Sequence, residues 1–158
     1  MVGINIRLRL ENFIVDAHQQ DILGNYFDTL RRQDDVNNPC AMLHRIQAFL
    51  TTSPPMFGQL ERQLVDFDFD VSRATLQRIT DDCVNVGGGR VIPRFLQLAR
   101  VLESRDHPLC LALLSVVKDE YTLLVAALAQ IAAMEEELAG HHISRREWRQ
   151  RMQRRRND

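Results

Sequence analysis

The chain has 158 residues, the usual size of one domain and long enough to bury a sizeable hydrophobic core. Hydrophobic residues make up 45% of the sequence and charged residues 26%, with 7 glycines and 5 prolines, which excludes a disordered, fibrous or collagen-like chain. The formal net charge is −1, but seven arginines gather between Arg145 and Arg156 and leave the rest of the chain acidic.

The cysteines and the N-terminus indicate an intracellular protein. Cys40, Cys83 and Cys110 are widely spaced and odd in number, which favours a reducing compartment. The first nine residues lack the apolar core and the cleavage site of a secretory signal. The longest uncharged apolar run, residues 121–134, falls short of the roughly 20 residues that a membrane-spanning helix needs. We therefore expect no membrane span.

The spacing of apolar residues predicts helices along the whole chain and no strand. The first helix is expected over about 4–20, and the apolar spacing leaves open its continuation to Leu30. Asn38 followed by Pro39 is a good N-cap with proline at the first helical position, so a second helix should begin there. Residues 53–55, Ser-Pro-Pro, are expected to end it, and a short third helix follows over about 57–64.

The second half of the chain is more apolar. A fourth helix over about 74–84 has a polar remainder that implies one exposed face. After the glycine run 87–89, the segments 91–102 and 109–131 carry apolar residues around most of the helix circumference. Helices of that kind belong inside a bundle, so these two segments should form a buried hairpin covered by the amphipathic helices.

The glycine run carries the most specific motif in the chain. Three glycines allow a tight corner between helices, and Arg90 stands where the next helix should begin. This corner resembles the first homology region of the Bcl-2 family of apoptosis regulators, which reads Asn-Trp-Gly-Arg before an apolar helix. Asn85 and the pair Gly89-Arg90 supply the matching residues, with two residues inserted and without the tryptophan.

A second segment extends the resemblance. Residues 57–64 look like the family's third helix, with its Phe-x-x-Met-x-x-x-Leu spacing, and the likeness covers about residues 40–135. It implies an all-α, Bcl-2-like helical bundle over residues 1–144 with a central apolar hairpin, followed by a basic C-terminal tail or terminal helix over 145–158. Residues 43–48 lack the glycine and aspartate of a BH3 segment, and no membrane anchor follows. A compact member without an anchor resembles a viral homologue, such as those of iridoviruses.

The resemblance implies an anti-apoptotic protein that sequesters the BH3 helices of pro-apoptotic proteins such as Bim, Bak and Bax in a hydrophobic groove. Arg90 would pair with the ligand's aspartate, and Asn85 would cap the next helix or bond the ligand backbone. The protein would act in the host cytoplasm, reaching the mitochondrial surface through its partners. The groove walls would be Leu43, Ile46, Phe49, Phe57, Leu60, Leu76, Ile79, Val91 and Phe95.

Other functions stay open at this point. The Arg145–Arg156 tail could instead bind nucleic acid or another acidic surface, although nucleic acid is not expected as the main partner, and an exposed apolar face could form a homodimer. The glycine run follows a helix instead of a strand, so it is not a phosphate-binding loop. No catalytic constellation stands out, and we expect no enzymatic activity, cofactor or metal site.

Overall fold

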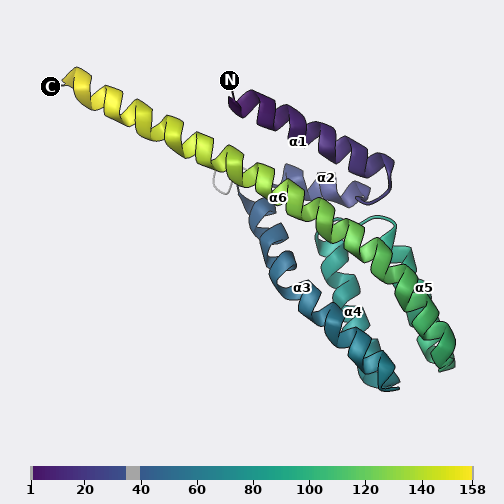
Figure 1. Cartoon of the computed structure of the whole chain (residues 1–158). Helices are drawn as coiled ribbons and strands as arrows, with labels where there is room; N and C mark the ends of the chain where they lie inside the picture. Colours follow the sequence, from purple (N-terminus) through teal and green to yellow (C-terminus); the bar gives the residue numbers. More distant parts are fainter. Residues whose placement is uncertain (1, 35–39, 158) are drawn as a thin grey trace.

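The computed structural model describes residues 2–34 and 40–157, with side chains from Asn5 to His141, apart from 35–39, and at 150 and 153–156. Asn38 and Pro39, the expected start of a helix, lie outside the described residues. Within them the chain is helical without a strand, so the predicted all-α class is confirmed. The helices are α1 (Val2–Gln19), α2 (Asn25–Arg32), α3 (Ala41–Val65), α4 (Phe69–Asn85), α5 (Val91–Ser104) and α6 (His107–Asn157) (Figure 1).

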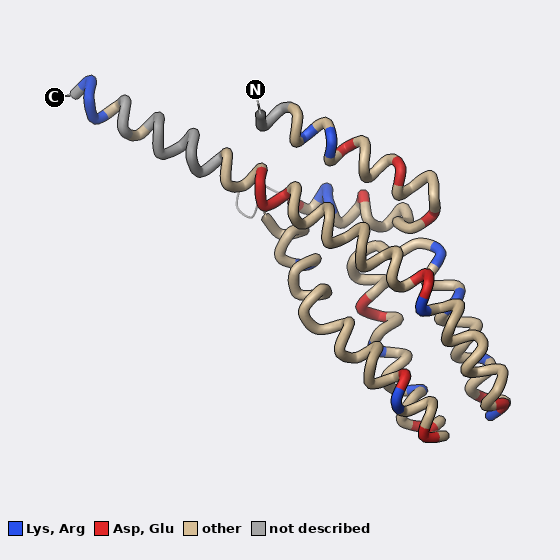
Figure 2. Tube along the Cα trace, viewed as in Figure 1, with Lys and Arg blue, Asp and Glu red and all other residues tan. Residues whose placement is uncertain are grey.

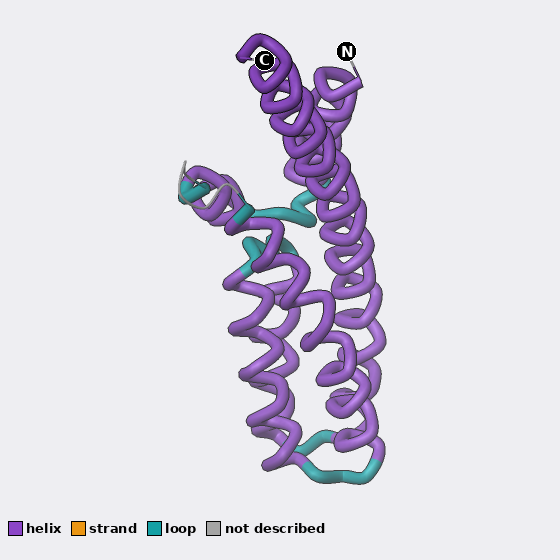
Figure 3. Tube along the Cα trace, turned by 90° about the vertical axis from the view of Figure 1, so that its left-hand side faces the viewer, coloured by secondary structure: helices purple, strands orange, loops and turns teal. Residues whose placement is uncertain are grey.

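Helices α3 to α6 form a four-helix bundle. Each packs against the next, and α3 also packs against α6, which closes the bundle. The connections 66–68, 86–90 and 105–106 are short, as expected for neighbouring antiparallel helices. Helix α1 packs against α6, and the short α2 lies near the upper end of the bundle (Figures 1 and 3). At 51 residues, α6 is about 75 Å long and extends well past the other three helices.

The core of the bundle combines aliphatic side chains with one buried hydrogen bond. The Tyr121 hydroxyl donates to Ser53 Oγ at 2.8 Å, and the Phe57 ring stacks on Tyr121 with centroids 4.5 Å apart. Burial raises the pKa of Tyr121 to about 12. Fully buried side chains around this pair include Ile46, Leu60, Leu76, Ile79, Phe95, Leu98, Leu124 and Leu128.

The prediction that residues 53–55 end a helix was wrong, because α3 runs through both prolines to Val65. Pro54 and Pro55 remove the two N–H groups that would bond the preceding turn. The helix continues because buried side chains lie on both sides of the pair, with Phe49 before it and Phe57 after it. Tertiary packing of this apolar face outweighs the local proline penalty.

The predicted central hairpin was also wrong. Helices α5 and α6 are two of the four bundle members, and each has a face open to solvent. Leu96 of α5 is 50% exposed, and Leu109, Val116 and Leu123 of α6 are 45%, 42% and 45% exposed. These residues follow the apolar pattern without being buried, so the pattern overstated how far the hairpin is enclosed.

Helix α6 continues from the bundle to Asn157 without a break at residue 144. The arginines described at 154–156 lie at its far end (Figure 2). Among the described residues, no helix combines the length and the apolar character that crossing a membrane requires.

Candidate functional site

The glycine corner between α4 and α5 fastens the turn between α1 and α2. The Gly89 amide donates to the Ile22 carbonyl at 2.9 Å, and the Arg90 amide donates to the Asp21 carbonyl at 2.7 Å. A Cβ at Gly89 would collide with the Asp21 carbonyl oxygen. Gly87 has φ +79°, and a Cβ there would collide with the Phe27 backbone. The glycines therefore serve close backbone packing.

Arg90 is held by a carboxylate of its own chain. Its Nε and Nη2 donate to the two Glu120 oxygens at 2.5 and 2.7 Å, a bidentate pair between the corner and α6. Glu120 is only 9% exposed. The hydrogen bond to Glu120 raises the pKa of Arg90. The guanidinium expected to bind a ligand's aspartate is thus already paired with a carboxylate of the same chain.

The side chains expected to line a groove lie in the core. All nine are at most 7% exposed, so they are not available as the walls of a surface groove. Asn85 is exposed at the end of α4, where its carbonyl accepts a long hydrogen bond from Arg45 Nη1 at 3.5 Å. The buried set is Leu43, Ile46, Phe49, Phe57, Leu60, Leu76, Ile79, Val91 and Phe95.

The outer face of α4 is a continuous exposed surface of the bundle. Its members are spaced by three or four residues and therefore lie on one side of the helix. Gln77 stands in the middle, and its Nε2 donates to Asp81 Oδ1 at 2.9 Å. Val84 adds an apolar side chain that is 40% exposed. We call this the α4 stripe, formed by Asp70, Ala74, Gln77, Asp81 and Val84.

Helix α4, which carries the α4 stripe, packs against α5. Arg73 Nη2 donates to Glu103 Oε1 at 2.6 Å and ties the two helices together near one end. Leu96 of α5 is 50% exposed. The sequence predicted an exposed face on this helix but gave no signal that it was a site, because its polar residues have the pattern of any solvated helix face.

The four histidines whose side chains the structure describes belong to elements other than α4. His18 Nδ1 lies 3.2 Å from the Leu23 carbonyl oxygen, and His18 Nε2 lies 3.0 Å from Asp28 Oδ1, so both ring nitrogens have partners. His107 Nε2 lies 2.7 Å from the Leu64 carbonyl oxygen. His44 and His141 are exposed.

No histidine occurs between His44 and His107, so α4 and α5 carry none. The side chain of His142 lies outside the described residues. Within the side chains that the structure describes, no three histidine, cysteine, aspartate or glutamate groups come together to hold a metal ion.

A charged cavity of about 480 Å³ lies between α1, α2 and α6. Arg31 donates to Glu11 at 2.7 and 3.1 Å and lies 3.8 Å from Glu135. The hydrogen bond from Arg31 lowers the pKa of Glu11, whereas burial raises the pKa of Glu135. These paired charges of both signs fasten α1 and α2 to α6, so we assign the cavity a structural role.

Solved structures similar to this fold include proteins described as histidine-containing phosphotransfer proteins. A rice protein described in this way superposes with a TM-score of 0.80 at 16% identity, covering 88% of this chain and 99% of that chain. The corresponding values are 0.76, 20%, 86% and 94% for a protein of Medicago truncatula. A maize protein gives 0.77, 18%, 84% and 99%. The sequence itself matches no protein-family model and no curated protein.

These comparisons correct the Bcl-2 interpretation. The chain has the helical bundle of histidine-containing phosphotransfer proteins. Sequence identities of 16% to 20% support a shared fold alone. The BH3-sequestering function, its partners Bim, Bak and Bax and the apoptotic context are therefore wrong, and the nucleic-acid or acidic-surface alternative is not supported either. The motif of Asn85, Gly89 and Arg90 misled because it is too short to identify a fold.

Proposed function

We propose that this chain is a non-catalytic binding protein of phosphorelay signalling, which docks on the partners of phosphotransfer proteins without carrying a phosphoryl group on its bundle. The observation that carries the proposal is the superposition over 99% of the rice and maize phosphotransfer proteins by a chain that has no histidine in α4 or α5. The proposed partners are histidine kinases and response regulators.

The chemistry of phosphoryl transfer supports the second half of the proposal. A histidine carrier needs an imidazole nitrogen open to solvent, so that this nitrogen and a carboxylate oxygen of the partner can lie in line on opposite sides of the phosphorus. The ring nitrogens of His18 face Leu23 and Asp28, and Nε2 of His107 faces the Leu64 carbonyl. The exposed imidazoles of His44 and His141 lie on α3 and α6, outside the α4 stripe. The amide of Gln77 at the centre of the α4 stripe is not a phosphoryl acceptor.

The α4 stripe and Leu96 give this bundle a surface suited to transient docking. Val84 and Leu96 supply exposed apolar contacts, and Gln77 with Asp81 supplies polar ones. Weak signalling interfaces combine apolar and polar groups in this way over a modest area. A protein that occupies the docking face of a response regulator would compete stoichiometrically with the phosphotransfer proteins.

A transfer assay tests the proposal directly. A response-regulator receiver domain, phosphorylated with radioactive phosphate, is mixed with the maize phosphotransfer protein and increasing amounts of this chain. We expect no acid-labile label on this chain and a fall in transfer to the maize protein as this chain approaches the receiver concentration. Label on this chain would make it a carrier, and unchanged transfer would remove it from the relay.

Matched variants locate the surface. Val84→Glu places a charge on the α4 stripe and should abolish the inhibition, whereas Leu123→Glu, at a similar exposure on α6, should leave it unchanged. Equal effects of both variants would contradict docking through α4. Should label appear on this chain, loss of that label in His44→Gln would assign it to the exposed imidazole of α3.

A further inference from the structure

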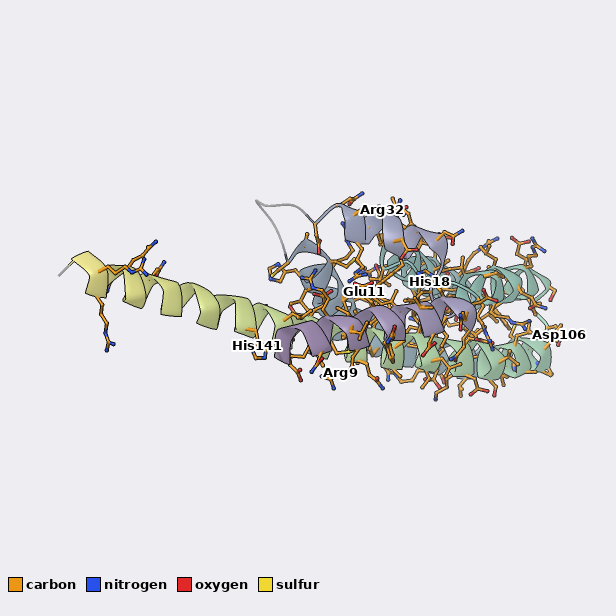
Figure 4. All side chains as sticks on the ribbon, turned by 90° about the horizontal axis from the view of Figure 1, so that it is seen from above. Arg9, Glu11, His18, Arg32, Asp106 and His141 are labelled. Atoms are coloured by element: carbon orange, nitrogen blue, oxygen red, sulfur yellow. The ribbon has the colours of Figure 1, made fainter. Side chains whose placement is uncertain are left out.

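The end of the bundle where α3 meets α4 and α5 meets α6 exposes several large apolar side chains. Val65 and Phe67 are 59% and 63% exposed, and Val71 and Leu109 are 46% and 45% exposed. We call residues 65–71 and 103–109 the aromatic end. It lies opposite the free end of α6: Asp106 and His141 are far apart in Figure 4, and the loops of the aromatic end close the bundle in Figure 3. Neighbouring exposed apolar side chains mark interaction surfaces.

Two residues at the aromatic end adopt a backbone conformation that side chains other than glycine rarely take. Phe67 has φ +61° and Arg105 has φ +55°. They follow the ends of α3 and α5, where glycine is the usual residue. A bulky residue in this region is strained, and such strain gathers at functional sites. The strain therefore indicates that the Phe67 side chain does something that glycine would not.

The Phe67 ring is held rigidly on one face. It stacks on His107 with centroids 3.8 Å apart and the planes 17° from parallel. His107 is fixed in turn by its Nε2 contact with the Leu64 carbonyl at 2.7 Å, and Phe69 meets the His107 ring edge-on at 6.2 Å. Because 63% of Phe67 stays exposed, an oriented aromatic surface faces solvent.

Carboxylates surround this aromatic surface. The aromatic end has five acidic residues and one arginine, which gives a net charge of −4 with His107 neutral. Arg105 Nη2 contacts Asp70 at 3.4 Å, and Glu103 is paired with Arg73. The other three carboxylates are Asp66, Asp68 and Asp106. Figure 2 shows acidic residues at the lower tips of the helices.

We propose that the aromatic end is a second docking surface, which binds a protein segment that carries arginine or lysine next to an apolar side chain. The cation would lie over the open face of Phe67, and the acidic rim would neutralise its charge. The apolar neighbour would contact Val65, Val71 or Leu109. Apart from Asp70, which belongs to both, this surface is separate from the α4 stripe, so it would bind a partner besides the one proposed above.

The test is an NMR titration of the full, ¹⁵N-labelled chain with a 12-residue synthetic peptide of alternating arginine and leucine. A matched peptide with glutamate in place of arginine is the control. We expect the largest shifts at residues 65–71 and 103–109, weaker binding at higher salt and no binding of the glutamate peptide. Equal binding of both peptides, or shifts centred elsewhere, would overturn the proposal.

Two variants separate docking from folding. Phe67→Gly removes the ring and relieves the left-handed strain, so we expect an unchanged or higher Tm together with about tenfold weaker peptide binding. The double variant Asp66→Asn, Asp68→Asn keeps the ring and lowers the negative charge, and should also weaken binding. Leu123→Ala, exposed elsewhere on α6, should bind as the natural chain does. If both the glycine and the asparagine variants bind normally, the aromatic end is not the site.

Discussion

Two carboxylates near Arg31, those of Glu11 and Glu135, have pKa values shifted in opposite directions. Glu11 accepts two hydrogen bonds from the guanidinium, which lowers its pKa below the ordinary value of 4.5. Glu135 lies 3.8 Å from the same group, but its burial outweighs the attraction and raises its pKa. A lowered carboxylate pKa in the folded state stabilises the fold at neutral pH, and a raised one destabilises it.

The first prediction follows from these opposite signs. Glu135→Gln should raise the free energy of unfolding at neutral pH. The reason is that the charge of Glu135 destabilises the fold once the pH rises above 4.5, the ordinary pKa of this carboxyl group in the unfolded chain. Glu11→Gln should lower the free energy of unfolding at neutral pH by at most about 1 kcal/mol. The Glu11 contribution is present above pH 4.5 and is lost as the pH falls through its lowered pKa.

Both effects should fade in acid, and urea unfolding at several pH values between 3 and 7 measures them. Changes of the same sign in the two variants would contradict this assignment of the cluster.

Local sequence predicted the position of Arg90 but not its partner. The three glycines and the apolar run after them indicated a corner followed by a helix, which the structure contains. Glu120 lies 30 residues further on, in a helix that looked uniformly apolar, and no spacing rule connects it with Arg90. Tertiary packing determines which charged residues pair across the fold, so the local sequence around Arg90 or Glu120 does not predict that they interact.

At the scale of elements, most helices could be predicted because apolar spacing follows the 3.6-residue period wherever a helix has one buried face. The side of α6 that is buried could not be predicted in this way. Leu123 and Leu124 are adjacent and chemically identical, yet they are 45% and 0% exposed. Composition cannot distinguish them, and the arrangement of α3 and α5 around α6 decides which one is buried.

The second prediction uses this neighbouring pair. Leu124→Ala should reduce the free energy of unfolding by about 2–5 kcal/mol, because it opens a cavity in the bundle core. Leu123→Ala changes a side chain on the solvent face and should alter stability by about half a kcal/mol or less. Chemical denaturation of both variants gives the comparison directly. Similar losses would place both side chains in equivalent surroundings and would contradict the bundle packing described above.

At the scale of the whole molecule, the sequence predicted the all-α class and not the topology of the bundle. Several helical folds contain amphipathic helices joined by a glycine corner, and the motif of Asn85, Gly89 and Arg90 is too short to distinguish them. The candidate site was harder still. The exposed face of α4 has the pattern of any solvated helix face, so the sequence did not single it out.

The last prediction concerns the extension of α6. Leu138 is the last buried apolar side chain described along the chain, and the contact of Arg9 with Glu137 at 3.6 Å lies beside it. Deleting residues 142–158 should therefore change Tm by no more than about 2 °C and leave the proposed inhibition of phosphoryl transfer intact, while the helical circular dichroism falls with the residues removed.

A longer deletion, from residue 128 onwards, provides the contrast. It removes Leu128, Ile131 and Leu138, which are 0%, 1% and 7% exposed, and it takes away the surface on which α1 packs. This variant should lose several kcal/mol of stability, because Ala132, which is 5% exposed, leaves the core together with these three side chains. A large fall in Tm for the shorter deletion alone would mean that the basic end of α6 belongs to the folded unit.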